Sequence, residues 1–290
     1  SLVIGTIFED LNQLKILLNN LNQNIYHLKE IICVVSGIDS DSKMKSLSSL
    51  EDIVNIKIEI IPIKKIIMPG EARNIGIIES KSDYVCFLDS RTLPGNNWLS
   101  SSIKILDEKK IRGTLGRTKY VPLDEFEKCF IAATYGNKPL FTLPGTLIEK
   151  SLLKEIGFFI PDSRCGEDSE WINRSLSFEK NIKQFEVVSS KYVGFKGMKF
   201  LDLCKKWYRN YQSTYLIPKL QIQRIIYLGS FFISLIFLTF SWNDKIANWD
   251  ENSFLYVPHI SKIMILLIFL TYSIFRFIVL PFKKNKSFFR

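Results

Sequence analysis

Four short apolar runs, separated by polar turns, mark the N-terminal part of the chain. They occupy residues 2–8, 31–35, 56–63 and 84–88. Between the first two runs, leucines recur at helical spacing at positions 11, 14, 17, 18 and 21. Apolar runs of this length are typical of buried strands, and the leucine spacing is typical of an amphipathic helix. The alternation predicts an α/β fold with a mostly parallel sheet and helices on both faces.

The pattern continues after the fourth run. We expect helices at residues 98–110, 124–135 and 150–156, and extended segments at residues 113–121 and 141–148. The last of these helices should end at Gly157, because glycine is a common helix stop.

The fourth apolar run ends in charged residues. Leu88 leads directly into Asp89, Ser90 and Arg91, and a Pro-Gly-Asn-Asn sequence follows. Ligands of open α/β sheets bind outside the carboxyl ends of the strands, so a carboxylate and a guanidinium at this point indicate an active site. The pattern alone also fits a strand that ends in a solvated turn.

Two further segments place charged residues at the start of a helix. Residues 69–76 fit a turn that leads into a helix, where free N–H groups and Arg73 suit a phosphate. Residues 166–174 start a helix with an acidic first turn, where Asp168 suits a general base in a cleft. A surface arginine and an acidic helix cap are the ordinary alternatives.

Composition limits the possible partners. The net charge of +10 fits an anionic partner, but much of the excess lies beside apolar segments, and no zinc-finger spacing or RNA-binding aromatic motif is present. We therefore expect membrane lipids, and no nucleic acid, as a partner. The five scattered cysteines are typical of reduced thiols in a cytosolic compartment, and two histidines argue against histidine-based metal sites. Because the chain lacks an initiator Met, we expect a short native segment before Ser1.

The C-terminal third has the pattern of a membrane anchor. Residues 198–218 predict an amphipathic helix, which fits either a membrane interface or packing on a soluble domain. Residues 225–242 and 263–282 carry one charge, Arg276, and are long enough to span a hydrocarbon core of roughly 30 Å. Basic residues flank the outer ends of both runs, so a multi-pass membrane protein is predicted, with the N-terminal domain and the C-terminus cytoplasmic. A buried helical hairpin is the alternative.

In their order and separation, these segments resemble the inverting family 2 glycosyltransferases of GT-A fold. The resemblance covers about residues 1–195 and is carried by five segments. Residues 3–8 and 34–39 are similar to the two nucleotide loops of the family, and residues 69–76 are similar to its segment under the diphosphate. Asp89-Ser90-Arg91 stands in the place of the DxD motif, and residues 144–168 are similar to the acceptor side. The resemblance implies a catalytic domain over residues 1–197, and the hydrophobic pattern adds an interfacial helix at 198–218 and a membrane hairpin at 219–290.

The resemblance also implies an activity and the residues that carry it. A membrane-anchored enzyme of this family would move a sugar, with inversion, from a nucleotide-diphosphate sugar to a hydroxyl of a glycan or lipid-linked saccharide. Asp168 would be the base that takes the proton of the acceptor hydroxyl. The residues implied on the donor side are Thr6, Ser36, Asp39, Arg73, Asn74, Asp89 and Arg91, and those on the acceptor side are Gly145, Glu167 and Trp171.

One departure from the family pattern bears on the metal. Arg91 stands where the DxD motif has its second carboxylate, and arginine does not bind a divalent cation. Arg91 could itself neutralise the leaving diphosphate, Asp89 alone could hold Mg²⁺ or Mn²⁺, or the enzyme could be degenerate. Two alternatives to transfer onto a hydroxyl acceptor stay open. One is a polyprenyl-phosphate glycosyltransferase. The other, which Arg91 suggests, is a non-catalytic membrane protein that binds nucleotide sugars.

Overall fold

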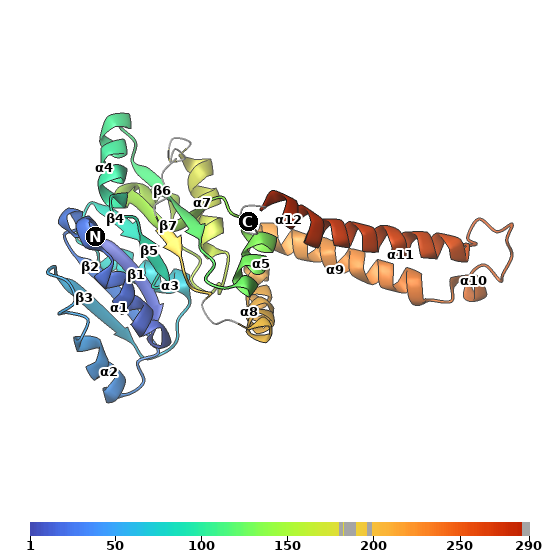
Figure 1. Cartoon of the computed structure of the whole chain (residues 1–290), viewed down its shortest axis with the longest axis horizontal. Coiled ribbons are helices and arrows are strands. Elements are labelled where there is room, and N and C mark those ends of the chain that lie inside the picture. Colours follow the sequence, from blue (N-terminus) through green and yellow to red (C-terminus); the bar gives the residue numbers. More distant parts are fainter. Residues whose placement is uncertain (180–181, 183–189, 196–198, 286–290) are drawn as a thin grey trace. The chain divides into compact units, whose positions relative to one another are not determined.

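The computed structural model describes residues 1–179, 182, 190–195 and 199–285, which form two compact units. The first unit comprises residues 1–131 and 137–217, and the second comprises residues 132–136 and 218–290. The first unit holds a sheet with the strand order β3-β2-β1-β4-β7-β6-β8-β5. Figure 1 labels the strands β1 to β7 of this sheet.

The first half of this sheet is parallel. The strands β1 (Leu2–Ile7), β2 (Ile31–Ser36), β3 (Ile58–Ile63) and β4 (Tyr84–Phe87) correspond to the four apolar runs of the sequence. β1 lies between β2 and β4, and every pairing among the four strands is parallel. The carboxyl ends of β1 and β4 therefore open at the same edge of the sheet, which is where ligands bind in this kind of fold.

The second half of the sheet is mixed. The strands are β5 (Thr92–Pro94), β6 (Gly113–Tyr120), β7 (Leu140–Glu149) and β8 (Ser190–Tyr192). β7 runs antiparallel to β4 and to β6, whereas β8 is parallel to β6 and antiparallel to β5. The predicted mostly parallel α/β sheet is thus confirmed in its N-terminal half, and the antiparallel additions follow the hairpin-like return of β7 along β6.

Helices cover both faces of the sheet, as the sequence predicted. Alternate residues of β1 separate the two faces: Leu2 and Ile4 join one apolar core, and Val3 joins the other. The first core is closed by α1 (Leu11–Asn19), α2 (Asp41–Ser48) and α4 (Trp98–Lys109). The second core is closed by α3 (Pro69–Glu79), α6 (Lys150–Ile156) and α7 (Glu167–Phe178). A further helix, α5, spans Glu125–Thr134.

The helix α8 (Phe200–Ser213) belongs to the first unit. The ring of Trp207 lies 5.9 Å from that of Phe130 on α5, and Phe130 in turn packs edge-on against Phe195 at 5.0 Å. Lys206 Nζ lies 4.9 Å from the centre of the Phe195 ring. Part of the aromatic face of this amphipathic helix is therefore used to pack it on the domain, which is the alternative that the sequence left open.

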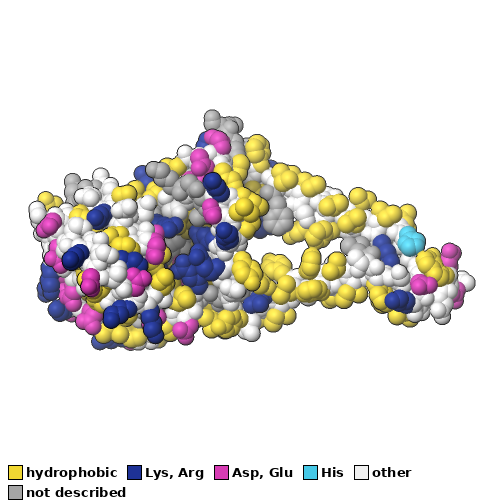
Figure 2. Space-filling view, turned by 90° about the horizontal axis from the view of Figure 1, so that it is seen from below, with side chains coloured by type: hydrophobic (Ala, Val, Ile, Leu, Met, Phe, Trp, Pro, Cys, Tyr) yellow, Lys and Arg dark blue, Asp and Glu magenta, His cyan; other side chains and the backbone are white. Residues whose placement is uncertain are grey.

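The second unit contains α9 (Pro218–Thr239), α10 (Trp242–Lys245), α11 (His259–Ile274), a π-helix (Phe275–Val279) and α12 (Leu280–Lys284). Hydrophobic side chains cover much of the surface of α9 and α11 (Figure 2). Among the described residues, however, no helix combines the length and the apolar character that crossing a bilayer requires. The predicted spans at 225–242 and 263–282, and the multi-pass localisation built on them, are wrong.

Helix boundaries give the physical reason for this correction. The first seven residues of α9 include Lys219 and Arg224, so its apolar part starts only at Ile225, and the helix ends at Thr239. The 16 residues of α11 are followed by a π-helix, Phe275–Val279, which carries Arg276, and the helical backbone continues through it into α12. The second predicted span is therefore divided between α11, the π-helix and α12.

The start of α3 is fixed by a close backbone contact. Pro69 occupies the first turn, and a Cβ atom at Gly70 would collide with the carbonyl oxygen of Ile160.

The Gly70→Ala variant should therefore lose about 2 kcal/mol of unfolding free energy, because backbone on both sides prevents relief of the collision. Urea unfolding followed by circular dichroism measures this loss. Gly229→Ala on α9 is the control, since no atom lies within 4 Å of its added Cβ, and it should not destabilise the protein. Equal stability of both variants would contradict the prediction.

Candidate active site

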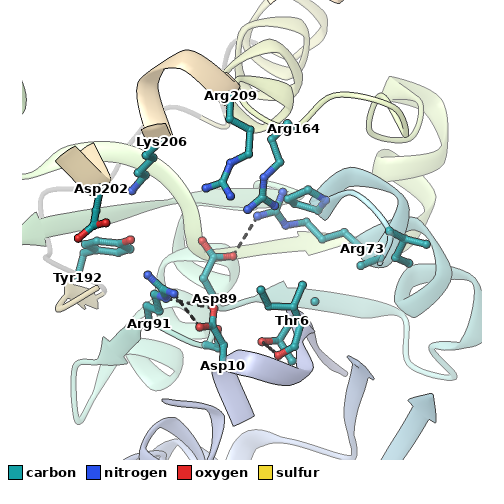
Figure 3. A pocket seen from close by; sticks show the side chains of 16 residues that line it. Thr6, Asp10, Arg73, Asp89, Arg91, Arg164, Tyr192, Asp202, Lys206 and Arg209 are labelled. Atoms are coloured by element: carbon teal, nitrogen blue, oxygen red, sulfur yellow. Dashed lines mark hydrogen bonds and ion pairs between the residues drawn. The ribbon is translucent and has the colours of Figure 1, made fainter. Parts of the chain in front are cut away.

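A cavity of about 390 Å³ opens at the carboxyl ends of β1 and β4 (Figure 3). Its residues come from the whole length of the first unit. They are Gly5, Thr6, Ile7 and Asp10 at the end of β1, Ile67, Pro69, Ala72 and Arg73 around the start of α3, Asp89, Ser90 and Arg91 after β4, Arg164 before α7, Tyr192 on β8, and Asp202, Lys206 and Arg209 on α8. Five cations and three carboxylates thus face one space.

Arg73 is the buried centre of this site. Its side chain is 8% exposed, and its Nη2 donates to Asp89 Oδ1 at 3.0 Å, while its Nη1 donates to Glu167 Oε1 at 2.8 Å. One guanidinium therefore joins α3 to the loop after β4 and to the first residue of α7. Two separate hydrogen bonds to one planar fork fix the position of both carboxylates.

The charges around Arg73 support one another. Burial by itself lowers the pKa of Arg73, but the carboxylates of Asp89, Glu167 and Asp168 outweigh it and raise the pKa, so the guanidinium stays charged. Burial raises the pKa of Glu167, and the charge of Asp168 acts in the same direction against the attraction of Arg73. Asp89 and Asp168, which are far apart in the sequence, therefore both act on the same cation.

Arg91 makes its own ion pair on the other side of the cavity. Its Nε and Nη2 donate to the two oxygens of Asp10 at 3.1 and 2.7 Å, and its Nη1 donates to the carbonyl oxygen of Gly194 at 3.2 Å. The hydrogen bonds that Arg91 donates to Asp10 raise the pKa of Arg91. The charge of Arg91 is thus largely balanced by Asp10.

Three further cations lie in the cavity, and no ion pair of theirs is found among the described residues: Arg164, Lys206 and Arg209. In Figure 3 they reach in from the side opposite Thr6 and Asp10. Burial lowers the pKa of Lys206 to about 8, and the charges of Arg91, Arg209 and Arg164 add to this effect. Burial also lowers the pKa of Arg164, with Arg209 as the next cause. These side chains therefore repel one another inside the cavity.

The structure brings some of the predicted donor residues together. Thr6, Arg73, Asp89 and Arg91 line the cavity. Three others lie outside its lining: Ser36 donates to the carbonyl oxygen of Thr6, the 68%-exposed side chain of Asp39 pairs with Lys43 at 3.0 Å, and the amide of Asn74 bonds both backbone groups of Phe159. The predicted roles of these three residues remain predictions.

The predicted acceptor-side residues form a second layer beyond the cavity lining. Glu167 contacts Arg73, the carbonyl oxygen of Gly145 accepts a hydrogen bond from Trp98, and the fully buried Trp171 donates to the carbonyl oxygen of Gly157. Asp168 is half-buried, and its Oδ1 accepts a hydrogen bond from the backbone N–H of Ser169 at 2.7 Å. Its carboxylate is therefore reachable from solvent.

Sequence reasoning missed six residues that line the cavity with a polar side chain: Asp10, Arg164, Tyr192, Asp202, Lys206 and Arg209. Three of them lie on α8, whose basic and aromatic pattern fits a membrane interface equally well. The pairing of Asp10 with Arg91 joins residues 81 positions apart, and no local pattern indicates it.

The donor set of the cavity does not fit a divalent cation. Among the described residues, no group of three or more His, Cys, Asp or Glu side chains is arranged to hold a metal. Asp89 is paired with Arg73, and Asp10 is paired with Arg91. Mg²⁺ and Mn²⁺ prefer several oxygen ligands, and two of the three carboxylates of the lining already have a cationic partner, whereas the third, Asp202, accepts a hydrogen bond from the backbone N–H of Lys199.

Comparisons with known proteins concern the family and the fold. The model of the family described as "Glycosyl transferase family 2" matches residues 1–164. No curated protein matches the chain at a significant level.

Two similar solved structures are from S. aureus and Pyrobaculum calidifontis. TarS residues 1–349 of S. aureus, in complex with UDP-GlcNAc, is 16% identical at a TM-score of 0.52 and shares the fold. The match covers 76% of this chain and 65% of that one, so the chain spans less than two thirds of the length of TarS 1–349. The mannosyltransferase PcManGT of P. calidifontis, in complex with GDP-Man and Mn²⁺, is 16% identical over 74% of this chain and 62% of its own, at a TM-score of 0.49.

The buried pair of Arg73 and Glu167 generates a stability prediction. Arg73→Met should cost about 3 kcal/mol of unfolding free energy, because it leaves Glu167 buried without its cation, and Arg73→Met combined with Glu167→Met should recover most of the loss. Chemical denaturation of both variants tests this.

Arg112 provides the matched control for this prediction. It also contacts two carboxylates, Glu149 at 2.9 Å and Glu155 at 2.8 Å, but its side chain is 37% exposed. Arg112→Met should therefore cost less than about 1 kcal/mol. An Arg73→Met loss no larger than the Arg112→Met loss would mean that the buried pair does not hold the site together.

Proposed function

The chain belongs to glycosyltransferase family 2, and from this premise we propose that it transfers a sugar from a nucleoside-diphosphate sugar to a hydroxyl of a glycan or lipid-linked saccharide, with inversion at the anomeric carbon. The observation that carries the proposal is that Arg73 binds both Asp89 and Glu167, the neighbour of Asp168, beside a cavity at the carboxyl ends of β1 and β4. Its size and charge suit an anionic donor.

In this reaction, the acceptor oxygen attacks the anomeric carbon while the bond from that carbon to the diphosphate oxygen breaks. The proton of the acceptor hydroxyl passes to the carboxylate of Asp168, and the bonding pair leaves with the diphosphate. Inversion requires the base and the leaving group on opposite sides of the sugar. We assign the two roles to separate residues, the carboxylate at the start of α7 and the cations that line the cavity.

Arg73 has a positioning role in this proposal. It is 8% exposed, and both of its terminal nitrogens are engaged by Asp89 and Glu167. It therefore fixes the donor-side loop against the acceptor-side helix, and Asp89 keeps one oxygen available to the cavity. Thr6, at the end of β1, lines the donor side of the same space.

The solved complex of TarS with UDP-GlcNAc suggests the first donor to test. We expect UDP-GlcNAc or another nucleotide sugar to raise the midpoint of thermal unfolding of the full chain, because a ligand that binds only the native state stabilises it. A panel of UDP- and GDP-sugars extends the search beyond this donor.

Replacement of the proposed base provides the mechanistic test. Asp168→Asn should lower the rate of sugar transfer by about 100-fold or more, as the loss of a general base does, while the affinity for the donor changes little. Steady-state transfer rates and donor titration measure the two effects separately.

Asp162→Asn is the matched control, because Asp162 is exposed and precedes α7. It should transfer sugar at the wild-type rate. Full activity of Asp168→Asn would remove this residue from the mechanism and would point to an acceptor that already carries its own negative charge.

A further inference from the structure

The cations of the cavity fall into two sets. Arg73 and Arg91 are each bound to carboxylates, at 2.7–3.0 Å for the closest contacts. For Arg164, Lys206 and Arg209, no ion pair is found in the described part of the chain, although the rest of the cavity contains acidic groups. We call these three residues the cation triad.

Two separate segments supply the cation triad. Lys206 and Arg209 are three residues apart on α8, so both project from the same face of that helix. Arg164 precedes α7 and reaches the same space from the segment that ends at the helix start (Figure 3). Trp207 and Lys206 pack on Phe130 and Phe195, which fixes this part of α8 on the domain.

In the described part of the chain, no carboxylate is within ion-pair distance of these three cations. The pKa of Lys206 and that of Arg164 are lowered, first by burial and then by neighbouring cations. Repulsion of this kind is relieved when an anion enters the cavity. A diphosphate has the charge and the oxygens to accept hydrogen bonds from all three side chains.

We propose that the cation triad binds the diphosphate of the donor and takes the place of the divalent cation that the fold family implies. This inference rests on the proposed function. Its structural support is the cavity itself: Asp89 and Asp10 are already paired with Arg73 and Arg91, so neither a metal ligand set nor a free charge on Arg91 is left for that task. A metal ion would add positive charge to a cavity in which three cations already repel one another.

The first experiment measures binding without turnover. Isothermal titration of the full chain with UDP, in excess EDTA and in Mg²⁺, should give dissociation constants within threefold of each other. Arg164→Gln, Lys206→Met and Arg209→Gln should each weaken UDP binding in EDTA by about tenfold, as the loss of one charge-assisted hydrogen bond predicts. Lys205→Met is the matched control, because Lys205 adjoins Lys206 on α8 but does not line the cavity, and its affinity should match the wild type.

The variants carry an internal check on folding. Each removes one of several repelling charges, so the thermal midpoint without ligand should stay the same or rise. Binding of UDP only in the presence of Mg²⁺, or wild-type affinity of all three folded variants in EDTA, would overturn the inference.

Inorganic pyrophosphate and GDP separate this inference from the proposed function. Binding of UDP or GDP that requires Mg²⁺ leaves the proposed function intact and refutes the cation triad. Binding of pyrophosphate in EDTA that depends on the triad, without binding of any nucleotide or nucleotide sugar, supports an anion site and refutes the donor assignment.

The dependence on pH gives an independent readout. Burial lowers the pKa of Lys206 to about 8, and the charges of Arg91, Arg209 and Arg164 add to this effect. Asp202, Tyr192 and the ring of Phe195 also surround Lys206. A bound anion favours the charged form, so UDP affinity should fall severalfold as the pH rises from 7 to 9 and Lys206 loses its proton. Lys206→Met should flatten this profile. An unchanged slope in Lys206→Met would show that another group is responsible.

Discussion

The site depends on one buried guanidinium. Arg73 binds Asp89 after β4 and Glu167 at the start of α7, and it is shielded from water on nearly all sides. A buried charge is strongly destabilising unless partners of opposite charge bind it. Arg73 therefore requires both Asp89 and Glu167 to be in place when the protein is folded. The loop after β4 and the start of α7 therefore keep a fixed separation, although 94 positions separate Arg73 from Glu167 in the sequence.

The distribution of charge divides the cavity into two regions. Near the sheet, every cation has a carboxylate partner, as in the pairs Arg73–Asp89 and Arg91–Asp10. Toward α8, positive charge accumulates without such partners in the described part of the chain. If the cavity binds a diphosphate as we propose, the paired charges hold its walls in place and the cations toward α8 face the ligand. The helix α8 is thus part of the site, and its basic residues have a local role.

Much of the fold follows from the sequence. The apolar runs predict β1 to β4 because buried parallel strands need continuous hydrophobic residues, and Asp89 is found at a strand end for the same reason. Long-range pairs such as Asp10–Arg91 are not predictable from local patterns. The C-terminal unit shows the opposite error: a count of apolar residues over 263–282 does not show that this stretch is divided between α11, a π-helix and α12. Hydropathy measures composition, whereas the length of a helix depends on its backbone.

The amide of Asn74 has a consequence for how this protein can vary. Its oxygen and nitrogen bond the backbone N–H and carbonyl of Phe159 at 3.0 and 2.9 Å, in the manner of a neighbouring strand. These two hydrogen bonds fix the segment around Asn74 against the segment around Phe159. The 85 positions of sequence between the two residues do not determine this alignment. Insertions or deletions in the surface loops between these two residues can therefore change the surface of the protein without changing how the two segments are aligned.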